Sequence, residues 1–95
     1  MEYIDVLWLH ELADSPVRLV SELDAQRYET RKLEFFRSGA VGFANERQAS
    51  SGTELGQMEV PPLAEINQDP EFRGTLIDES VFEALWRLHV PAADD

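Results

Sequence analysis

Four charged residues in the stretch SELDAQRYETRKLEFF, residues 21–36, have side chains that could take part in acid–base chemistry: Glu22, Glu29, Arg31 and Glu34. Acid–base catalysis needs two titratable groups that converge on one reacting atom and differ in pKa. The stretch alternates polar and apolar residues as a β-strand does, which sends Glu22 and Glu34 to one face and Glu29 with Arg31 to the other. Charges divided between two faces are typical of ion pairs across strands, so we predict no catalytic residue here.

The histidines offer the other candidate chemistry, and there are only two, His10 and His89. His10 shares a predicted strand face with Trp8 and is expected to be packed and hydrogen-bonded at the edge of the core, whereas His89 is expected at the carboxyl end of a helix. The chain has no glycine-rich phosphate loop, no histidine pair at metal-binding spacing and no nucleophile elbow, so we predict no metal and no cofactor. The alternative is a small-ligand or enzyme pocket around Trp8, His10 and Arg31.

The length and composition indicate one small globular domain. The chain has 95 residues, 43% of them hydrophobic, and it has no cysteine that could form a disulfide. The N-terminus MEYIDVLWLH lacks the basic start of a signal peptide, and no apolar run reaches the roughly 20 residues of a membrane-spanning helix. We therefore expect a cytoplasmic protein that does not enter a membrane.

The charge of the chain narrows the kinds of partner. Nineteen acidic residues against eight basic ones give a net charge of −11. This excess of acids disfavours binding to nucleic acids and to anionic membranes, because proteins that bind them carry clusters of Lys and Arg. It suits a basic protein partner, since opposite potentials speed encounter.

The periodicity of the sequence predicts an α+β fold: a four-stranded antiparallel meander, then a short helix, then a C-terminal helix that packs on one face of the sheet. Asp78 is expected to cap the last helix, and Pro91 to end it. The predicted ranges are strands at about 3–12, 17–23, 28–37 and 40–45, a mobile loop at 46–57, helices at about 61–67 and 79–89, and a frayed tail at 91–95.

Charge pairing predicts the register between the second and third strands. With residues 25–27 as a three-residue loop, Val17 faces Phe35 and Arg18 faces Glu34. A slip by one residue would place like charges opposite each other and mix polar with apolar residues on one face. The three-residue loop is therefore favoured.

Each face of the sheet carries an apolar set. The C-terminal helix is expected to bring Phe82, Leu85 and Trp86 against Ile4, Val6, Trp8, Leu19, Leu33 and Phe35. The opposite face carries Leu7, Leu9, Val20, Phe36, Val41 and Phe43. Either the segment MEVPPLAEI covers this second face with Val60, Leu63 and Ile66, or the face meets another chain; we favour the first, because monomers seldom expose large apolar patches.

Four stretches carry a resemblance to a known family. They are WLHELADSPV from Trp8, SELDAQRYETRKLEFF from Ser21, VPPLAEINQDPEF from Val60 and FEALW from Phe82. Their order over nearly the whole chain resembles a family of small single-domain bacterial proteins of unknown function. That resemblance implies no activity, although small acidic proteins of this kind are similar in character to the immunity proteins that neutralise bacterial toxins.

These observations together favour a non-enzymatic interaction protein, most concretely an inhibitor or immunity protein that covers a basic site on a bacterial toxin. Glu22, Glu34, Glu54 and Glu59 are the predicted partner contacts. The chain would act as a monomer, or as a homodimer if the second sheet face pairs with its own copy.

Overall fold

The structure is a computed structural model and describes residues 1–91, so most of the predicted tail lies outside the described part. Its elements are β1 (Glu2–Trp8), β2 (Pro16–Leu23), β3 (Glu29–Phe36), β4 (Val41–Asn45), α1 (Leu63–Ile66), β5 (Phe72–Ile77) and α2 (Glu79–His89). The strands form one sheet in the order β4-β3-β2-β1-β5, and all neighbouring strands are antiparallel. The fold is thus a small mixed domain with a C-terminal helix, as predicted. No helix within residues 1–91 is long and apolar enough to cross a membrane.

β5 is the strand that the sequence prediction missed. It pairs along β1, so the sheet has five strands instead of four. Its six residues lie between Pro70 and Asp78, which mark boundaries in the sequence, and Gly74 interrupts their alternation. A short strand with a central glycine gives only a weak periodic signal in the sequence. The strand is stabilised by its pairing with β1, which the local sequence does not show.

The first strand is shorter than predicted and ends at Trp8 instead of near residue 12. The His10 Nδ1 atom accepts a hydrogen bond from the Leu12 backbone N–H at 2.9 Å, and its Nε2–H donates to the Pro16 carbonyl oxygen at 2.7 Å. The histidine therefore closes these residues into a loop, in agreement with its predicted hydrogen-bonded role. The other predicted strands agree with the structure to within one residue, and α2 has the predicted bounds.

Five residues separate β2 from β3, and residues 25–27 form the predicted three-residue turn among them, but the register beyond the turn differs from the prediction. The Asp24 N–H donates to the Tyr28 carbonyl oxygen at 3.0 Å across this loop. The pairing then shifts by one residue, and Glu22 lies opposite Arg31 with Thr30 as the additional residue. This is a β-bulge, which the charge-pairing argument did not foresee.

The bulge overturns the predicted side-chain pairs and reassigns the faces of β3. Arg18 lies opposite Phe35 instead of Glu34, and Leu19 lies opposite Glu34. From Arg31 onward, a shift of one residue moves each side chain of β3 to the other face relative to β2. Leu33 therefore lies on the face opposite to Leu19, and the prediction that both lie under one helix was wrong.

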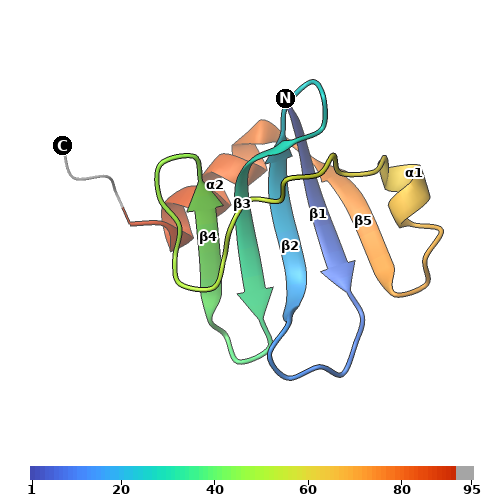
Figure 1. The fold of residues 1–95 in the computed structure, drawn as a ribbon, viewed down its shortest axis with the longest axis horizontal. Helices are drawn as coiled ribbons and strands as arrows, with labels where there is room; N and C mark the ends of the chain where they lie inside the picture. Colours follow the sequence, from blue (N-terminus) through green and yellow to red (C-terminus); the bar gives the residue numbers. More distant parts are fainter. Residues whose placement is uncertain (92–95) are drawn as a thin grey trace.

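Two different layers cover the sheet (Figure 1). On one side, here the helix face, α2 packs Phe82 against Tyr3, Val20 and Leu33, all of them buried. The chain between β4 and β5, residues 46–71, passes over the other side; it is called here the crossover segment, and that side the crossover face (Figure 1).

The crossover face has a core of its own. Buried Ile4, Val6 and Leu23 pack against partly buried apolar residues of the crossover segment and β5: Val60, Leu63, Ile66 and Phe72. The segment MEVPPLAEI thus covers one face, as predicted, but the face is that of Ile4 and Val6, which had been assigned to the C-terminal helix. The prediction that the C-terminal helix covers Ile4 and Val6 was therefore wrong.

Arg27 fixes the crossover segment to the β2–β3 loop. Its guanidinium donates to the carbonyl oxygens of Val60 at 2.7 Å and Pro61 at 2.9 Å, and it pairs with Glu2 at 2.8 Å. The Val60 N–H donates back to the Arg27 carbonyl at 2.8 Å. Arg27 has a φ of 68°, the left-handed region that a non-glycine residue seldom occupies, so these bonds hold a strained residue in place.

Residues of the same chain also occupy both edges of the sheet. At β4, Ala44 forms a β-bridge with Ala49 of the crossover segment. At β5, the Asn67 side-chain amide donates to the Gly74 carbonyl at 3.0 Å and accepts from the Gly74 N–H at 2.6 Å. The side chain of Asn67 therefore takes the place of a neighbouring strand at this position.

The predicted loop over residues 46–57 lies against the sheet, and its mobility stays a prediction. Thr53 is only 5% exposed and donates to the Glu34 carboxylate at 3.0 Å. Gly42 of β4 permits this approach, because a Cβ atom at Gly42 would lie 2.0 Å from the Thr53 Oγ1 atom.

We expect Gly42→Ala to lower the free energy of unfolding by about 1–3 kcal/mol, because the added methyl group overpacks the contact with Thr53. Chemical denaturation measures this change. Thr53→Ala removes the colliding hydroxyl, so the double variant should lose less stability than the sum of the two single variants. Additive losses would contradict the proposed contact.

Candidate functional site

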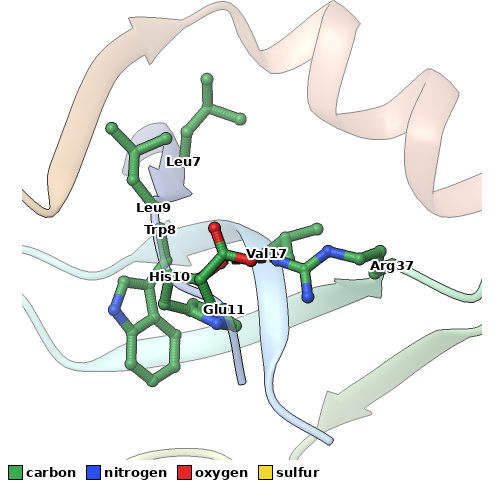
Figure 2. A pocket seen from close by; sticks show the side chains of 7 residues that line it. All are labelled: Leu7, Trp8, Leu9, His10, Glu11, Val17 and Arg37. Atoms are coloured by element: carbon green, nitrogen blue, oxygen red, sulfur yellow. Dashed lines mark hydrogen bonds between the residues drawn. The ribbon is translucent and has the colours of Figure 1, made fainter. Parts of the chain in front are cut away.

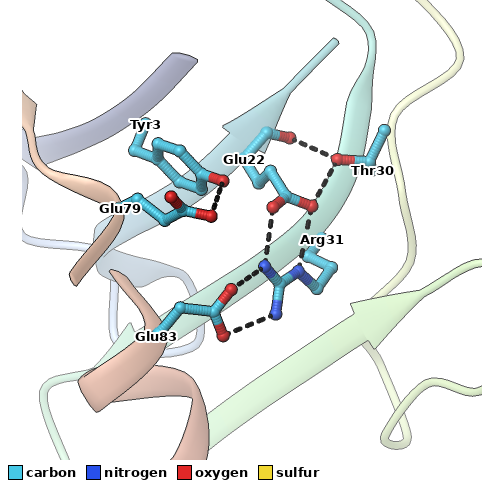
Figure 3. A network of polar contacts seen from close by, with 6 residues as sticks. All are labelled: Tyr3, Glu22, Thr30, Arg31, Glu79 and Glu83. Atoms are coloured by element: carbon cyan, nitrogen blue, oxygen red, sulfur yellow. Dashed lines mark hydrogen bonds and ion pairs between the residues drawn. The ribbon is translucent and has the colours of Figure 1, made fainter. Parts of the chain in front are cut away.

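The bulge in β3 brings three polar residues into one row across the helix face. Glu22 lies opposite both Tyr3 of β1 and Arg31 of β3. α2 lies over this row and adds Glu79 and Glu83 to it (Figure 3). The result is a polar network between sheet and helix, called here the Arg31 network.

The Arg31 guanidinium lies between two carboxylates. It donates to Glu22 from Nε at 2.9 Å and from NH2 at 2.6 Å, and to Glu83 from NH1 at 3.1 Å and from NH2 at 2.5 Å. The Thr30 hydroxyl also donates to Glu22, at 2.7 Å. Two bidentate contacts make this the most extensively bonded cation in residues 1–91.

The surroundings of Arg31 are apolar as well as charged. Its guanidinium carbon lies 4.8 Å from the ring centroid of Phe82 and 5.1 Å from that of Trp86. Such stacking suits Arg, whose planar cation is weakly hydrated. The side chains of Glu22 and Arg31 are 9% and 20% exposed, so the pair is largely shielded from water.

The pKa shifts in the network all lead away from pH 7: those of the carboxylates are lowered, and those of Arg31 and Tyr3 are raised. Hydrogen bonds from Arg31 hold the pKa values of Glu22 and Glu83 below the ordinary range, and the same bonds raise the pKa of Arg31. Burial, helped by Glu22, raises the pKa of Tyr3 to about 12, and its hydroxyl donates to Glu79 at 3.4 Å. General acid–base catalysis needs a group that titrates near the working pH, so this network supports structure better than proton transfer.

A cavity of about 400 Å³ opens beside the network. Glu22, Thr30 and Arg31 line it together with Met1, Asn45, Glu46 and Arg47. The first three are already bonded to one another, so a ligand here would have to compete with internal ion pairs.

The alternative pocket around Trp8, His10 and Arg31 is not assembled. Trp8 and His10 line a hollow of about 640 Å³ at the end of β1 (Figure 2), with their ring centroids 4.4 Å apart. Arg31 lies near the other end of the sheet, in the row that contains Tyr3. The basic residue that lines the hollow is instead Arg37, which donates to the His10 carbonyl at 2.6 Å.

The hollow in Figure 2 lies at the end of the sheet and is not a cleft in one face. The Trp8 indole points away from Leu7 and Leu9, as expected for neighbours on a strand. Both His10 nitrogens are already bonded within the loop. Glu11 also lines the hollow and forms no ion pair within residues 1–91, but both nitrogens of the neighbouring histidine are engaged, so no pair of free acid and base groups is assembled. His89, the other histidine, lies in the last turn of α2 as predicted, and its ring packs edge-on against Phe35.

A second charged cluster lies on the crossover face around Lys32. The Lys32 Nζ atom is 3.3 Å from the Glu29 carboxylate and 3.7 Å from that of Glu34. Ser21 donates to Glu29 at 3.3 Å, and the Gly56 N–H donates to it at 2.7 Å. The side chains of Lys32, Glu29 and Glu34 are 10–13% exposed, so the cluster lies between β3 and the crossover segment and is largely shielded from water.

The predicted partner contacts divide into two kinds. Glu22 and Glu34 are enclosed in the Arg31 network and the Lys32 cluster. Glu54 and Glu59 are exposed on the crossover segment. Within residues 1–91, no group of three or more His, Cys, Asp or Glu residues is arranged to hold a metal ion.

Sequence reasoning missed Tyr3 and Glu83 as members of the network. Glu83 had a usable signal, since it lies next to the apolar stripe of α2 formed by Phe82 and Trp86. An acid at the border of such a stripe reaches the sheet and needs a cation there. Tyr3 had no such signal, because its neighbours depend on how β1 pairs.

Arg31→Met should lower the free energy of unfolding by about 3 kcal/mol, because it leaves the enclosed Glu22 carboxylate without its counter-charge. Arg73→Met is the matched control, since Arg73 is exposed and forms no ion pair within residues 1–91, and it should change stability little. Chemical denaturation at pH 7 compares them. Equal losses in the two variants would contradict a structural role for Arg31.

The same network predicts acid sensitivity. The folded pKa values of Glu22 and Glu83 lie below the ordinary value of about 4.3, so the unfolded chain binds more protons in acid. The stabilisation is complete above about pH 4.3 and decreases as the pH falls toward the lowered values. Denaturation curves between pH 6 and pH 3 should therefore show a steeper loss for the natural chain than for Glu22→Gln/Glu83→Gln.

Tyr3 predicts the opposite behaviour in alkali. Its folded pKa of about 12 exceeds the ordinary value of about 10, so its contribution is complete below pH 10 and is lost as the pH rises toward 12. Tyr3→Phe cannot ionise and should reduce the fall in the free energy of unfolding between pH 9 and pH 11. An unchanged slope in this variant would show that Tyr3 ionises as an exposed tyrosine does.

Comparison with known proteins gives a family but no activity. The family model described as "Domain of unknown function (DUF6881)" matches residues 2–91, which include all five strands and both helices. No curated protein and no solved structure matches the chain. The predicted resemblance to a family of unknown function is thereby confirmed at the level of the family. The chain belongs to the family described as domain of unknown function DUF6881.

Proposed function

We propose that this chain is a non-enzymatic acidic interaction protein that binds a basic protein, most concretely as an inhibitor or immunity protein that covers a basic site on a bacterial toxin. One observation carries the proposal. Between Arg47 and Arg73 the chain has five acidic residues and no basic one, and all five are exposed: Glu54, Glu59, Glu65, Asp69 and Glu71. They are called here the acidic crossover surface.

Some of the acids elsewhere in the fold have a different role. Six acidic residues form ion pairs with four bases inside the molecule, and these are Glu2, Asp5, Glu22, Glu29, Glu34 and Glu83. None of the acidic crossover surface takes part in these pairs. Eleven acidic residues within residues 1–91 form no ion pair, and the five of the acidic crossover surface follow one another along the chain with no base between them.

This distribution supports an interaction surface better than it supports catalysis. Exposed acids on one segment attract a basic partner over a distance and orient it as it approaches. The crossover segment is also fixed to the sheet through Arg27, Glu29 and Glu34, so it can present its charges without first becoming ordered. Of the predicted contacts, Glu54 and Glu59 belong to this surface, and contact through Glu22 and Glu34 stays a prediction.

The test is co-expression with basic proteins encoded beside the gene for this chain, followed by affinity measurement on purified proteins. The triple variant Glu54→Gln/Glu59→Gln/Glu65→Gln should weaken binding roughly tenfold or more, since each exposed pair contributes up to about 1 kcal/mol. It should also lose protection if the partner is toxic to the cell. Raising the salt concentration should reduce the difference between variant and natural chain.

A matched control separates a local surface from net charge. Glu11→Gln/Asp14→Asn/Asp78→Asn removes the same number of charges from exposed residues outside the crossover segment. We expect this variant to bind nearly as tightly as the natural chain. Equal weakening by both triple variants, or binding to none of the neighbouring basic proteins, would overturn the proposal.

A further inference from the structure

An apolar hollow lies between the sheet and the crossover segment, on the crossover face. Its volume is about 310 Å³, and its apolar walls are Val6, Leu19, Val60, Ile66 and Phe72. This is the small end of the range of ligand pockets, which runs from roughly 300 to 1,000 Å³. The hollow is distinct from the Arg31 network, which lies on the helix face.

The structure holds the walls of this hollow in place without a ligand. Arg27 fixes Val60 and its neighbour Pro61 through their carbonyl oxygens, at 2.7 and 2.9 Å. On the other side, Asn67 joins the end of α1 to Gly74 of β5 through two hydrogen bonds. Because the walls are fixed by polar contacts outside the hollow, a ligand would enter a preformed site and would not have to order it.

The polar groups at the hollow carry negative charge. Glu29 and Asp69 line it with Ser21, and no basic residue is among its lining residues. Lys32 pairs with both Glu29 and Glu34, so these three groups together retain one negative charge. Asp69 is exposed at the opening and forms no ion pair within residues 1–91. An apolar hollow with negatively charged groups beside it is complementary to a cation that has an apolar body.

We propose that the hollow is a binding site for a small organic cation, in which a single ring or branched alkyl body fills the apolar walls and an ammonium group lies toward Glu29 and Asp69. The apolar area supplies the attraction and the carboxylates supply selectivity for charge. The hollow shares one residue, Asp69, with the acidic crossover surface. Its test is nevertheless separate from that of the proposed protein partner, because the residues substituted there, Glu54, Glu59 and Glu65, do not line the hollow.

Three probes of similar shape and different charge test the site on the isolated protein by NMR titration. Benzylamine is a cation, benzyl alcohol is its neutral counterpart, and benzoate is an anion. Benzylamine should shift the methyl signals of Val6, Leu19, Val60 and Ile66 with a dissociation constant in the roughly millimolar range expected of so small a ligand. Benzyl alcohol should bind several-fold more weakly, and benzoate should leave these signals unchanged.

Two substitutions with matched controls locate the binding. Leu19→Trp fills the hollow and should abolish the benzylamine shifts, whereas Leu88→Trp places the same ring at an exposed position of α2 and should not change them. Asp69→Asn removes one charge while its carbonyl oxygen can still accept the hydrogen bond from the Glu71 N–H, so it should weaken benzylamine severalfold. Asp14→Asn, at an exposed turn, is its control and should have no effect.

The outcomes decide the proposal in either direction. Selective benzylamine binding that Leu19→Trp and Asp69→Asn reduce, and their controls do not, supports it. It is overturned if no probe shifts these methyl signals, if benzyl alcohol or benzoate binds as tightly as benzylamine, or if Asp69→Asn and Asp14→Asn behave alike. The Asp69→Asn comparison keeps the test valid even if Leu19→Trp disturbs the fold, because Asp69 is at the surface.

Discussion

One guanidinium group determines how the sheet and α2 fit together. Arg31 can reach Glu22 only because the bulge at Thr30 places the two residues opposite each other. Its remaining donors are then directed at Glu83 of α2, and its flat face lies on Phe82. A cation enclosed in this way must keep its partners, so the ion pairs fix both the register of β3 and the position of the helix. The apolar core on the helix face depends on that arrangement.

Most elements of the fold could be predicted from local sequence, whereas their pairing could not. The bounds of α2 followed from its apolar stripe, with Asp78 at the expected cap position although its side chain makes no capping hydrogen bond. β5 could not be predicted because its stability comes from β1 and not from its own residues. The bulge was not predicted because the charge-pairing argument treats the two strands as regular. The additional residue, Thr30, then reversed the face assignment of each β3 residue that follows it.

Prediction of the candidate site was limited because it, too, depends on how distant elements pair and pack. That the charges of β2 and β3 neutralise one another was foreseen, and the structure pairs them with different partners: Arg31 with Glu22, and Lys32 with Glu29. Long-range members such as Glu83 depend on where α2 packs, which alternation along a strand does not specify. The apolar hollow depends on the route of the crossover segment, and irregular backbone carries no periodic signal from which such a route could be read.

The contacts at the two edges of the sheet bear on how the folded protein behaves at high concentration. Exposed backbone groups at a sheet edge are templates for strands of other molecules, and aggregation and fibril growth begin there. Here an incoming strand would have to displace the Asn67 amide from Gly74, or the bridge between Ala44 and Ala49. The native molecule therefore offers few starting points for fibrils, and polymerisation through the sheet would first require local unfolding of the segment that connects its edges.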